Sequence, residues 1–358
     1  MARPTPLPPV DRRRAIALSS DVPGASGSSA PPDRRVILGA ELGRGNASTV
    51  FAGVLESPHG VQRRVAVKVI DASTHDEQEP VPTAIFNAVK MAALIVHPNV
   101  AATYEVVFEG HTVMIISELI DGCTLEAFID AYTKMDRKVP PDLALFMATE
   151  IAEGLAAARD TRNLEGGLLN MSHGELSARE VLVSWNGEVK LTDFGLAQAI
   201  RPASGVRNIR SFARRAATLA PEVAKGRRPD ARSDVFALGI LMREMLVGPR
   251  WSPSISDQDA FARAREGDIE MNVLEPRLYE PVAEILNRAL ELDPSNRFPH
   301  AGAMAFELRR ASLPLGIGDN RLFLRHAMHD MLAIPPETDQ ASEADRTAPA
   351  RRSRTGHL

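Results

Sequence analysis

Two neighbouring stretches of the sequence decide the fold. They read His173-Gly174-Glu175-Leu176-Ser177-Ala178-Arg179-Glu180-Val181-Leu182-Val183 and Val189-Lys190-Leu191-Thr192-Asp193-Phe194-Gly195. The pattern predicts a polar loop, a short apolar strand, a turn at Asn186-Gly187, a second strand, and then a corner made by an acidic, an aromatic and a glycine residue. An acidic corner therefore directly follows the second strand of a predicted hairpin.

Two upstream segments have the composition expected of a phosphate site. Leu42 to Phe51 reads as strand, turn and strand, and the glycines in its turn allow backbone N–H groups to approach an anion closely. In Val65 to Val69, alternation places Lys68 opposite the valines, where a lysine among small apolar residues needs a partner or a ligand. The alternatives are glycines that serve only the turn, and an edge-strand lysine that reaches solvent.

Taken in order, these motifs resemble those of protein kinases, and most closely the bacterial members of the eukaryotic-like serine/threonine kinases. The resemblance extends over about residues 36 to 310 and includes Ala220-Pro221-Glu222, Ser233 to Gly239 and Asp293 to Arg297. It implies an α+β, bilobal protein-kinase-like fold, with a small β-rich N-lobe containing one main helix and a larger, mostly helical C-lobe.

The resemblance also implies a site for ATP with Mg²⁺ or Mn²⁺. The matching cofactor-binding positions are Gly43, Gly45, Ser48, Val50, Ala66, Lys68, Glu118 and Leu119. The matching catalytic residues are Lys68, Asp193 and Glu175, with Glu175 as the base, and the metal ligands are Asp193 and Glu180. The resemblance implies two structural roles as well. Asp234 anchors the backbone of the catalytic loop, which is the polar stretch from His173 to Glu180, and Glu222 forms a salt bridge with Arg297.

The sequence departs from the family at the catalytic positions. Glu175 replaces the family's Asp, Ser177 its Lys, Glu180 its Asn, and Ala88 the helix Glu that pairs with the strand lysine. A base misplaced by about 1 Å costs on the order of 10²-fold in rate. Without a carboxylate at position 88, Lys68 is less well oriented, unless Glu77 or Glu79 substitutes along a different chain path.

These departures favour a pseudokinase or a strongly impaired kinase that keeps its nucleotide pocket and signals by binding proteins, including another kinase or its substrates. The competing hypothesis is an active enzyme that transfers phosphate to Ser or Thr hydroxyls with Glu175 as base, so the sequence leaves enzymatic activity open. A remote third alternative is a small-molecule phosphotransferase, because His173-Gly174-Glu175 is also similar to the H-G-D loop of those enzymes.

Composition sets limits on the partners and the compartment. The 358 residues carry a net charge of -4, which gives no argument for binding nucleic acid or a membrane. A single cysteine, Cys123, excludes an internal disulfide framework and fits a reducing compartment. No apolar run is long enough to span a bilayer, so we expect a cytoplasmic protein.

The chain divides into a domain with flanking arms. We predict a disordered Pro/Arg/Ser-rich arm over 1–33, a kinase-like domain over 34–312 with lobes of about 34–119 and 120–312, a docked helix within 313–334 and a disordered tail over 335–358. Within the N-lobe, a helix is predicted from Thr83 to Val96, with Val96 on its buried stripe. In the Arg-rich segment after Leu196, Ser204 and Ser211 are candidate phosphorylation sites.

Overall fold

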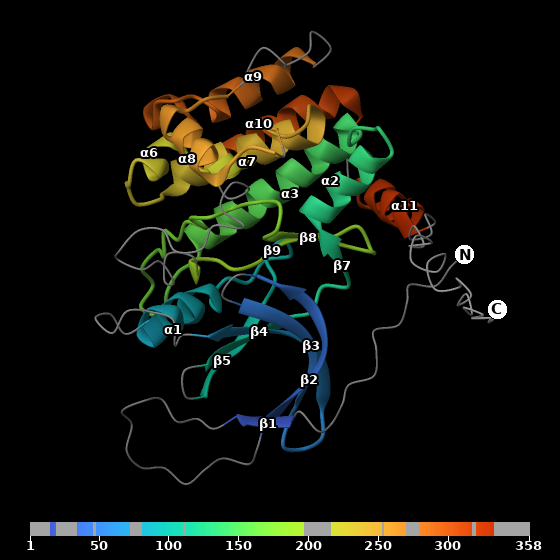
Figure 1. Cartoon of the computed structure of the whole chain (residues 1–358), viewed down its shortest axis with the longest axis vertical. Coiled ribbons are helices and arrows are strands. Elements are labelled where there is room, and N and C mark those ends of the chain that lie inside the picture. The colour runs from blue at the N-terminus through green and yellow to red at the C-terminus, as the bar shows by residue number, and fades with distance from the viewer. Residues whose placement is uncertain are drawn as a thin grey trace, which may run out of the picture.

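The structure is a computed structural model that describes residues 15–18, 34–45, 48–71, 81–109, 112–196, 216–252, 254–269, 279–316 and 320–332. These residues form two lobes, one built on a β-sheet and one built mostly of helices (Figure 1). This is the α+β, bilobal arrangement that the sequence predicts.

The smaller lobe is a six-stranded antiparallel sheet with the order β1-β2-β3-β4-β6-β5. Its strands are β1 (Ala15–Leu18), β2 (Arg34–Arg44), β3 (Ser48–Glu56), β4 (Gln62–Asp71), β5 (Thr103–Glu109) and β6 (Thr112–Glu118). Alternation along β4 buries Val65 and Val67 on one face and places Lys68 and Ile70 on the other. The second face is covered by helix α1 (Val81–Ala92), whose Ile85 joins Ile70 in one apolar cluster.

Helix α1 is shorter than the sequence predicts. It ends at Ala92, and the amides of Leu94 and Ile95 then donate to carbonyls only three residues earlier, which tightens the last turn. The rotation turns Ile95 into the core and leaves Val96 93% exposed, so the prediction of a helix through a buried Val96 is wrong.

A strand lies within the predicted disordered arm. Residues Ala15–Leu18 form β1, which pairs antiparallel with Arg34 to Ile37 of β2. Four consecutive residues without a charge (Ala-Ile-Ala-Leu) add to the open edge of the sheet, where backbone N–H and C=O groups otherwise lack partners. The remainder of the arm and the tail after Leu332 lie outside the described residues.

The larger lobe is organised around two long helices. It contains α2 (Leu125–Lys134), α3 (Pro141–Asp160), α6 (Pro221–Ala224), α7 (Ala231–Leu246), α8 (Asp257–Glu266), α9 (Glu280–Ala289), α10 (Ala301–Ser312) and α11 (Arg321–Leu332), with short 3₁₀ turns at Pro294–Asn296 and Leu313–Leu315. Helix α3 packs against α7 and α10, and its Met147 and Ile151 are buried. A small sheet of β7 (Gly122–Thr124), β8 (Val181–Ser184) and β9 (Val189–Leu191) lies at the edge of this lobe that faces the other one.

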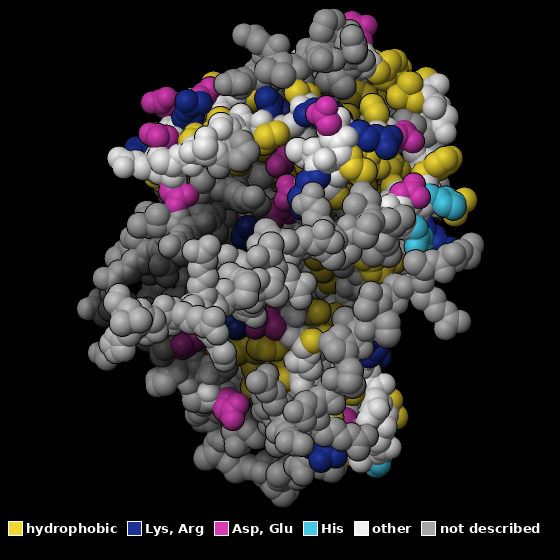
Figure 2. All heavy atoms as spheres, turned by 45° about the vertical axis from the view of Figure 1, so that its right-hand side comes forward, with side chains coloured by type: hydrophobic (Ala, Val, Ile, Leu, Met, Phe, Trp, Pro, Cys, Tyr) yellow, Lys and Arg dark blue, Asp and Glu magenta, His cyan; other side chains and the backbone are white. Residues whose placement is uncertain are grey.

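Side chains of both charge signs are interspersed over the described part of the face shown in Figure 2. This part of the surface therefore has no single-signed area of the kind that attracts nucleic acid. Among the helices that the structure describes, none combines the length and apolar character needed to cross a bilayer.

Candidate nucleotide site

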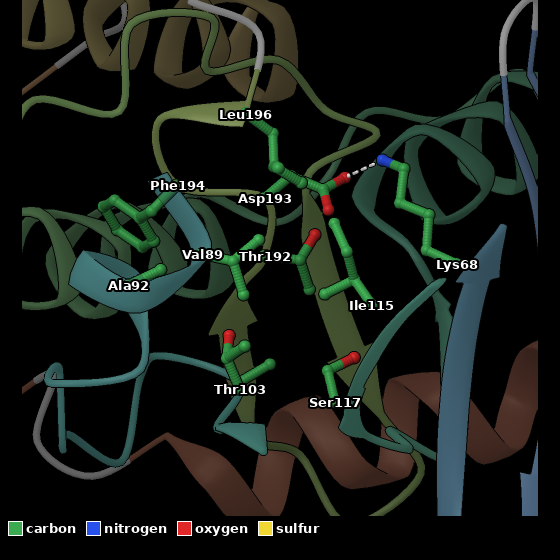
Figure 3. A pocket seen from close by; sticks show the side chains of 11 residues that line it. Lys68, Val89, Ala92, Thr103, Ile115, Ser117, Thr192, Asp193, Phe194 and Leu196 are labelled. Atoms are coloured by element: carbon green, nitrogen blue, oxygen red, sulfur yellow. Dashed lines mark hydrogen bonds and ion pairs between the residues drawn. The ribbon is translucent and has the colours of Figure 1, made fainter. Parts of the chain in front are cut away.

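The centre of the site is an ion pair between Lys68 and Asp193. Strand β4 places Lys68 on the face toward α1, and Asp193 lies two residues beyond the end of β9. Lys68 Nζ donates to Asp193 Oδ2 at 2.6 Å, and the two side chains are partly buried, 21% and 29% exposed (Figure 3). Asp193 has a positive φ of 66°, an uncommon conformation for a residue with a side chain, which aims its carboxylate at the lysine.

A small cavity lies beside this pair. Its volume is about 40 Å³, and it is lined by Lys68, Val89, Ala92, Ala101, Thr103, Ile115, Ser117, Thr192, Asp193, Phe194 and Leu196 (Figure 3). That volume holds a water molecule or a small apolar group, whereas drug-sized ligands need roughly 300–1,000 Å³. Of the predicted site residues, only Lys68 and Asp193 line it, so it is a recess at the back of the site and not the whole site.

Helix α1 presents an alanine to the acidic corner. A Cβ placed on Gly195 would lie 3.7 Å from the Cβ of Ala88, so position 88 faces the corner, where the family has its glutamate. The carboxylate that the structure pairs with Lys68 is instead Asp193. Glu77 and Glu79, the alternative partners for Lys68, lie outside the described residues.

A buried carboxylate of the larger lobe holds the catalytic loop. Asp234, at the start of α7, accepts from the amides of His173 at 2.7 Å and of Gly174 at 2.9 Å. Burial raises the pKa of the Asp234 carboxyl, although His173 and the two amides oppose the shift. His173 Nε2 in turn lies 2.9 Å from the carbonyl oxygen of Thr192, which links the loop to the corner. The predicted role of Asp234 as the loop anchor is confirmed.

Two residues of the loop that replace family residues bind each other. The Ser177 hydroxyl donates to Oε2 of Glu180, within the short turn that closes the loop. The amide of Thr192 donates to the carbonyl of Glu180 at 2.9 Å, which fixes the backbone of Glu180 beside the corner. Glu175, the predicted base, is half-buried in the same loop. Its predicted role and that of Glu180 as a metal ligand stay predictions.

The remaining predicted nucleotide contacts lie on the sheet and the connection between the lobes. Gly43 is at the end of β2, and the amide of Gly45 donates to the carbonyl of Ser48 at 2.7 Å, which closes the Gly-rich turn. Val50 lies opposite Lys68 in the β3–β4 ladder, and Ala66 lies opposite Ser117 in the β4–β6 ladder. Their roles in binding a nucleotide stay predictions.

The side chain of Glu118 is bound by a lysine that the sequence did not single out. Lys190 Nζ on β9 donates to both carboxylate oxygens, at 2.8 and 3.0 Å, and the amide of Ala102 donates to one of them. The amide of Glu118 donates to the Ala102 carbonyl at 2.8 Å. Lys190 therefore ties Glu118 to the larger lobe where the chain passes between the lobes.

The oxygen ligands fit a magnesium ion that shares its coordination with phosphates. Mg²⁺ is commonly held by one or two carboxylates together with phosphate oxygens and water, and Asp193 and Glu180 are hard oxygen donors of this type. In the portion of the chain that the structure describes, no group of three or more His, Cys, Asp or Glu side chains is arranged to hold a metal alone. A metal held here would therefore depend on the nucleotide for the rest of its ligands.

The larger lobe contains a second ion pair, which together with Asp234 forms the framework of the site. Arg297 donates to Glu222 through Nη1 at 2.7 Å and through Nη2 at 2.9 Å, and the Arg297 side chain is fully buried. This confirms the predicted salt bridge. The Arg-rich segment, with Ser204 and Ser211, lies outside the described residues.

Comparison with known proteins agrees with this geometry. The sequence profile of the protein tyrosine and serine/threonine kinase family matches residues 36–305. The chain belongs to the protein kinase family.

Individual kinases are similar over the same region. The tyrosine-protein kinase MasK of Myxococcus xanthus is 28% identical over 275 residues, which cover 75% of this chain and 42% of MasK. The serine/threonine-protein kinase PknB of Mycobacterium leprae is 28% identical over 284 residues, 77% of this chain and 43% of PknB. PknL of Mycobacterium tuberculosis is 28% identical over 299 residues, 82% of this chain and 70% of PknL. The kinase chain thus spans less than half the length of the first two relatives.

Sequence reasoning missed two features of this kinase site. The Lys190–Glu118 pair had a signal, since Lys190 interrupts an apolar strand and so needs a partner. The Ser177–Glu180 bond had a weaker one, because residues three apart in a turn are within reach of each other.

Proposed function

We propose that this kinase-family protein binds ATP with a divalent cation, transfers phosphate weakly or not at all, and signals by binding protein partners, including another kinase or its substrates. The observation that carries the proposal is the pairing at the floor of the site. Lys68 and Asp193, the residues retained for phosphate and metal, bind each other. Ser177 and Glu180, two of the residues that replace family residues, also bind each other.

Phosphoryl transfer depends mainly on positioning and on neutralising charge at the phosphates. The serine at position 177 removes a positive charge, and the carboxylate of Glu180 adds a negative one. With Ala88 at the corner, α1 offers no carboxylate to hold Lys68 once it leaves Asp193. These changes remove charge balance and orientation, while Gly43, Lys68 and Asp193 are retained for the nucleotide.

Each group that remains has a part in binding. Lys68 neutralises phosphate charge, the Gly-rich turn at Gly43 and Gly45 lets the backbone approach the phosphates, and the connection at Glu118 and Leu119 borders the adenine. Asp193 and Glu180 hold Mg²⁺ or Mn²⁺, which supplies charge neutralisation at the phosphates when bound.

Nucleotide binding is tested by thermal unfolding with and without millimolar ATP and Mg²⁺. A ligand that binds only the folded state raises its stability by RT ln(1 + [L]/Kd). We expect a rise in Tm that Lys68→Met reduces and that Lys225→Met, at an exposed position far along the chain, leaves unchanged. The absence of any rise in the unaltered protein contradicts nucleotide binding.

Phosphoryl transfer is tested by incubation with labelled ATP and Mg²⁺ or Mn²⁺, with Asp193→Asn as the control. We expect incorporation no greater than that of the control. Label that Asp193→Asn abolishes would instead establish the second candidate, an active serine/threonine kinase with Glu175 as its base. The intact framework favours that candidate, because Asp234 holds the amides of the loop and the Glu222–Arg297 pair is formed.

A further inference from the structure

Helix α11 lies beyond the part of the chain that matches the kinase family, which ends at residue 305. It is nevertheless docked on the larger lobe. Leu324 and Met328, one turn apart, are fully buried in the main core, whereas Leu322 and Phe323 on the same helix are more than half exposed. One face of α11 is therefore an integral part of the core.

The surface beneath α11 is the small sheet that follows the connection between the lobes (Figure 1). The sulfur of Met328 lies 3.9 Å from the sulfur of Cys123, the middle residue of β7. At the β8–β9 turn, Gly187 has a φ of 80°, and a Cβ there would lie 2.1 Å from the carbonyl oxygen of Arg321. The first residue of the helix thus packs against a position that only glycine can occupy.

This sheet is joined to the predicted nucleotide site, because Lys190 on β9 binds the carboxylate of Glu118. Cys123 is followed by Thr124, whose hydroxyl accepts from the amide of Ala127 and starts α2. The amide of Trp185, beside the turn under α11, donates to the carbonyl of Asp121 at 2.9 Å. Helix α11 therefore contacts the chain segment from Asp121 to Thr124 by two routes, one through Cys123 and one through the β8–β9 turn.

We propose that α11 is a positioning element for the nucleotide site, which holds β7 and the connection between the lobes in the binding geometry through Met328 against Cys123. This inference rests on the proposed nucleotide binding. It assigns a function in ligand affinity to a segment outside the matched kinase region.

Cys123 is the only cysteine of the chain and reports directly on the docking of α11. The experiment measures, on the full-length chain, the rate at which an aromatic disulfide reagent modifies Cys123 and the affinity for ATP with Mg²⁺. We expect Met328→Ala to increase the modification rate by at least tenfold and to weaken ATP binding several-fold. ATP should in turn slow the modification of the unaltered protein, because a ligand that binds the α11-docked state better shifts the docking equilibrium toward the state in which Cys123 is covered.

Two variants serve as controls. Phe323→Ala truncates an exposed side chain on the same helix and should change neither quantity. Met328→Leu keeps the volume and should restore both. If Met328→Ala exposes Cys123 but binds ATP as tightly as the unaltered protein, α11 has no positioning role. If the unaltered protein binds no ATP, the proposed function fails and the positioning role fails with it, whatever the thiol rate shows.

Discussion

In the helical lobe, Arg297 binds Glu222 through two nitrogens, and Asp234 accepts from two amides of the catalytic loop. At the floor of the site, Lys68 binds Asp193, and Ser177 binds Glu180. The first region, the framework, has the pairs that the kinase family resemblance implies, whereas the floor of the site has lost the partner of its lysine and changed three loop residues. The contrast separates two demands on the same loop: its backbone is held by Asp234 of the framework, and its chemistry depends on the side chains at the floor of the site.

The largest expected effect comes from restoring the family's residues at the floor of the site while the framework is left unchanged. The variant carries four substitutions: Ala88→Glu, Glu175→Asp, Ser177→Lys and Glu180→Asn. General-base catalysis is worth roughly 10²–10⁴-fold, so we expect labelled phosphate incorporation to rise by at least about 10²-fold over the unaltered protein. The same variant with Asp193→Asn is the control. If a folded, ATP-binding variant stays inactive, these positions do not limit transfer.

The next largest effect is expected from Arg297→Ala, which tests the framework. The substitution leaves the Glu222 carboxylate buried without its partner and removes a guanidinium stacked 4.8 Å from the centre of the Phe236 ring. Breaking a buried pair costs about 3–5 kcal/mol, which denaturant unfolding will detect.

The matched control is Arg309→Ala, which removes a solvent-exposed pair with Glu153. Surface pairs contribute roughly 0–1 kcal/mol. Equal losses in the two variants would contradict the assignment of Arg297 to the framework.

A smaller effect is expected from Asp234→Asn. The amide side chain keeps one acceptor but presents an N–H₂ group to an amide of the loop, so we expect a loss of about 1–3 kcal/mol and faster hydrogen exchange at His173 and Gly174. Asp230→Asn, on the same helix, is the control, because Asn caps a helix about as well as Asp. Unchanged exchange at the two amides would show that another contact holds the loop.

The smallest effect concerns the Cys123 thiol. Burial raises its pKa from 9.0 to about 11, and the thiolate is the reactive form. The alkylation rate of the folded protein should therefore keep rising toward pH 11, whereas that of the protein unfolded in guanidinium chloride should level off above pH 9. Between pH 9 and pH 11 the thiol is ionised in the unfolded chain but still protonated in the folded one. The free energy of unfolding therefore has its full value below pH 9 and falls as the pH rises through 11. Coincident profiles would show that α11 does not cover the thiol.

The framework could be predicted from the sequence because its residues belong to motifs whose order and spacing define their partners. Asp234 and the Glu222–Arg297 pair followed from such motifs. The orientation of Ala88 toward the corner also followed, from its distance in sequence to the residues after the helix. Local sequence and motif spacing were thus sufficient to predict the path of the backbone through both lobes.

The contacts at the floor could not be predicted, because each one is a choice among groups brought together by the tertiary fold. Lys68 and Asp193 are 125 residues apart, and the sequence offered Glu77 and Glu79 as substitute partners for the lysine only along a different chain path. The end of α1 was missed for a different reason. A single tightened turn changes which of Ile95 and Val96 faces the core, and a helical repeat carried past Ala92 selects the wrong one.

The short strand β1 has a consequence for how copies of the chain meet. It pairs with Arg34 to Ile37 and so covers part of the outer edge of β2, a strand of eleven residues. An uncovered edge of that length is a template onto which a strand of another molecule can add. Removing the residues before Arg34 therefore exchanges a four-residue edge for a longer one, which favours self-association in a protein whose fold is otherwise unchanged.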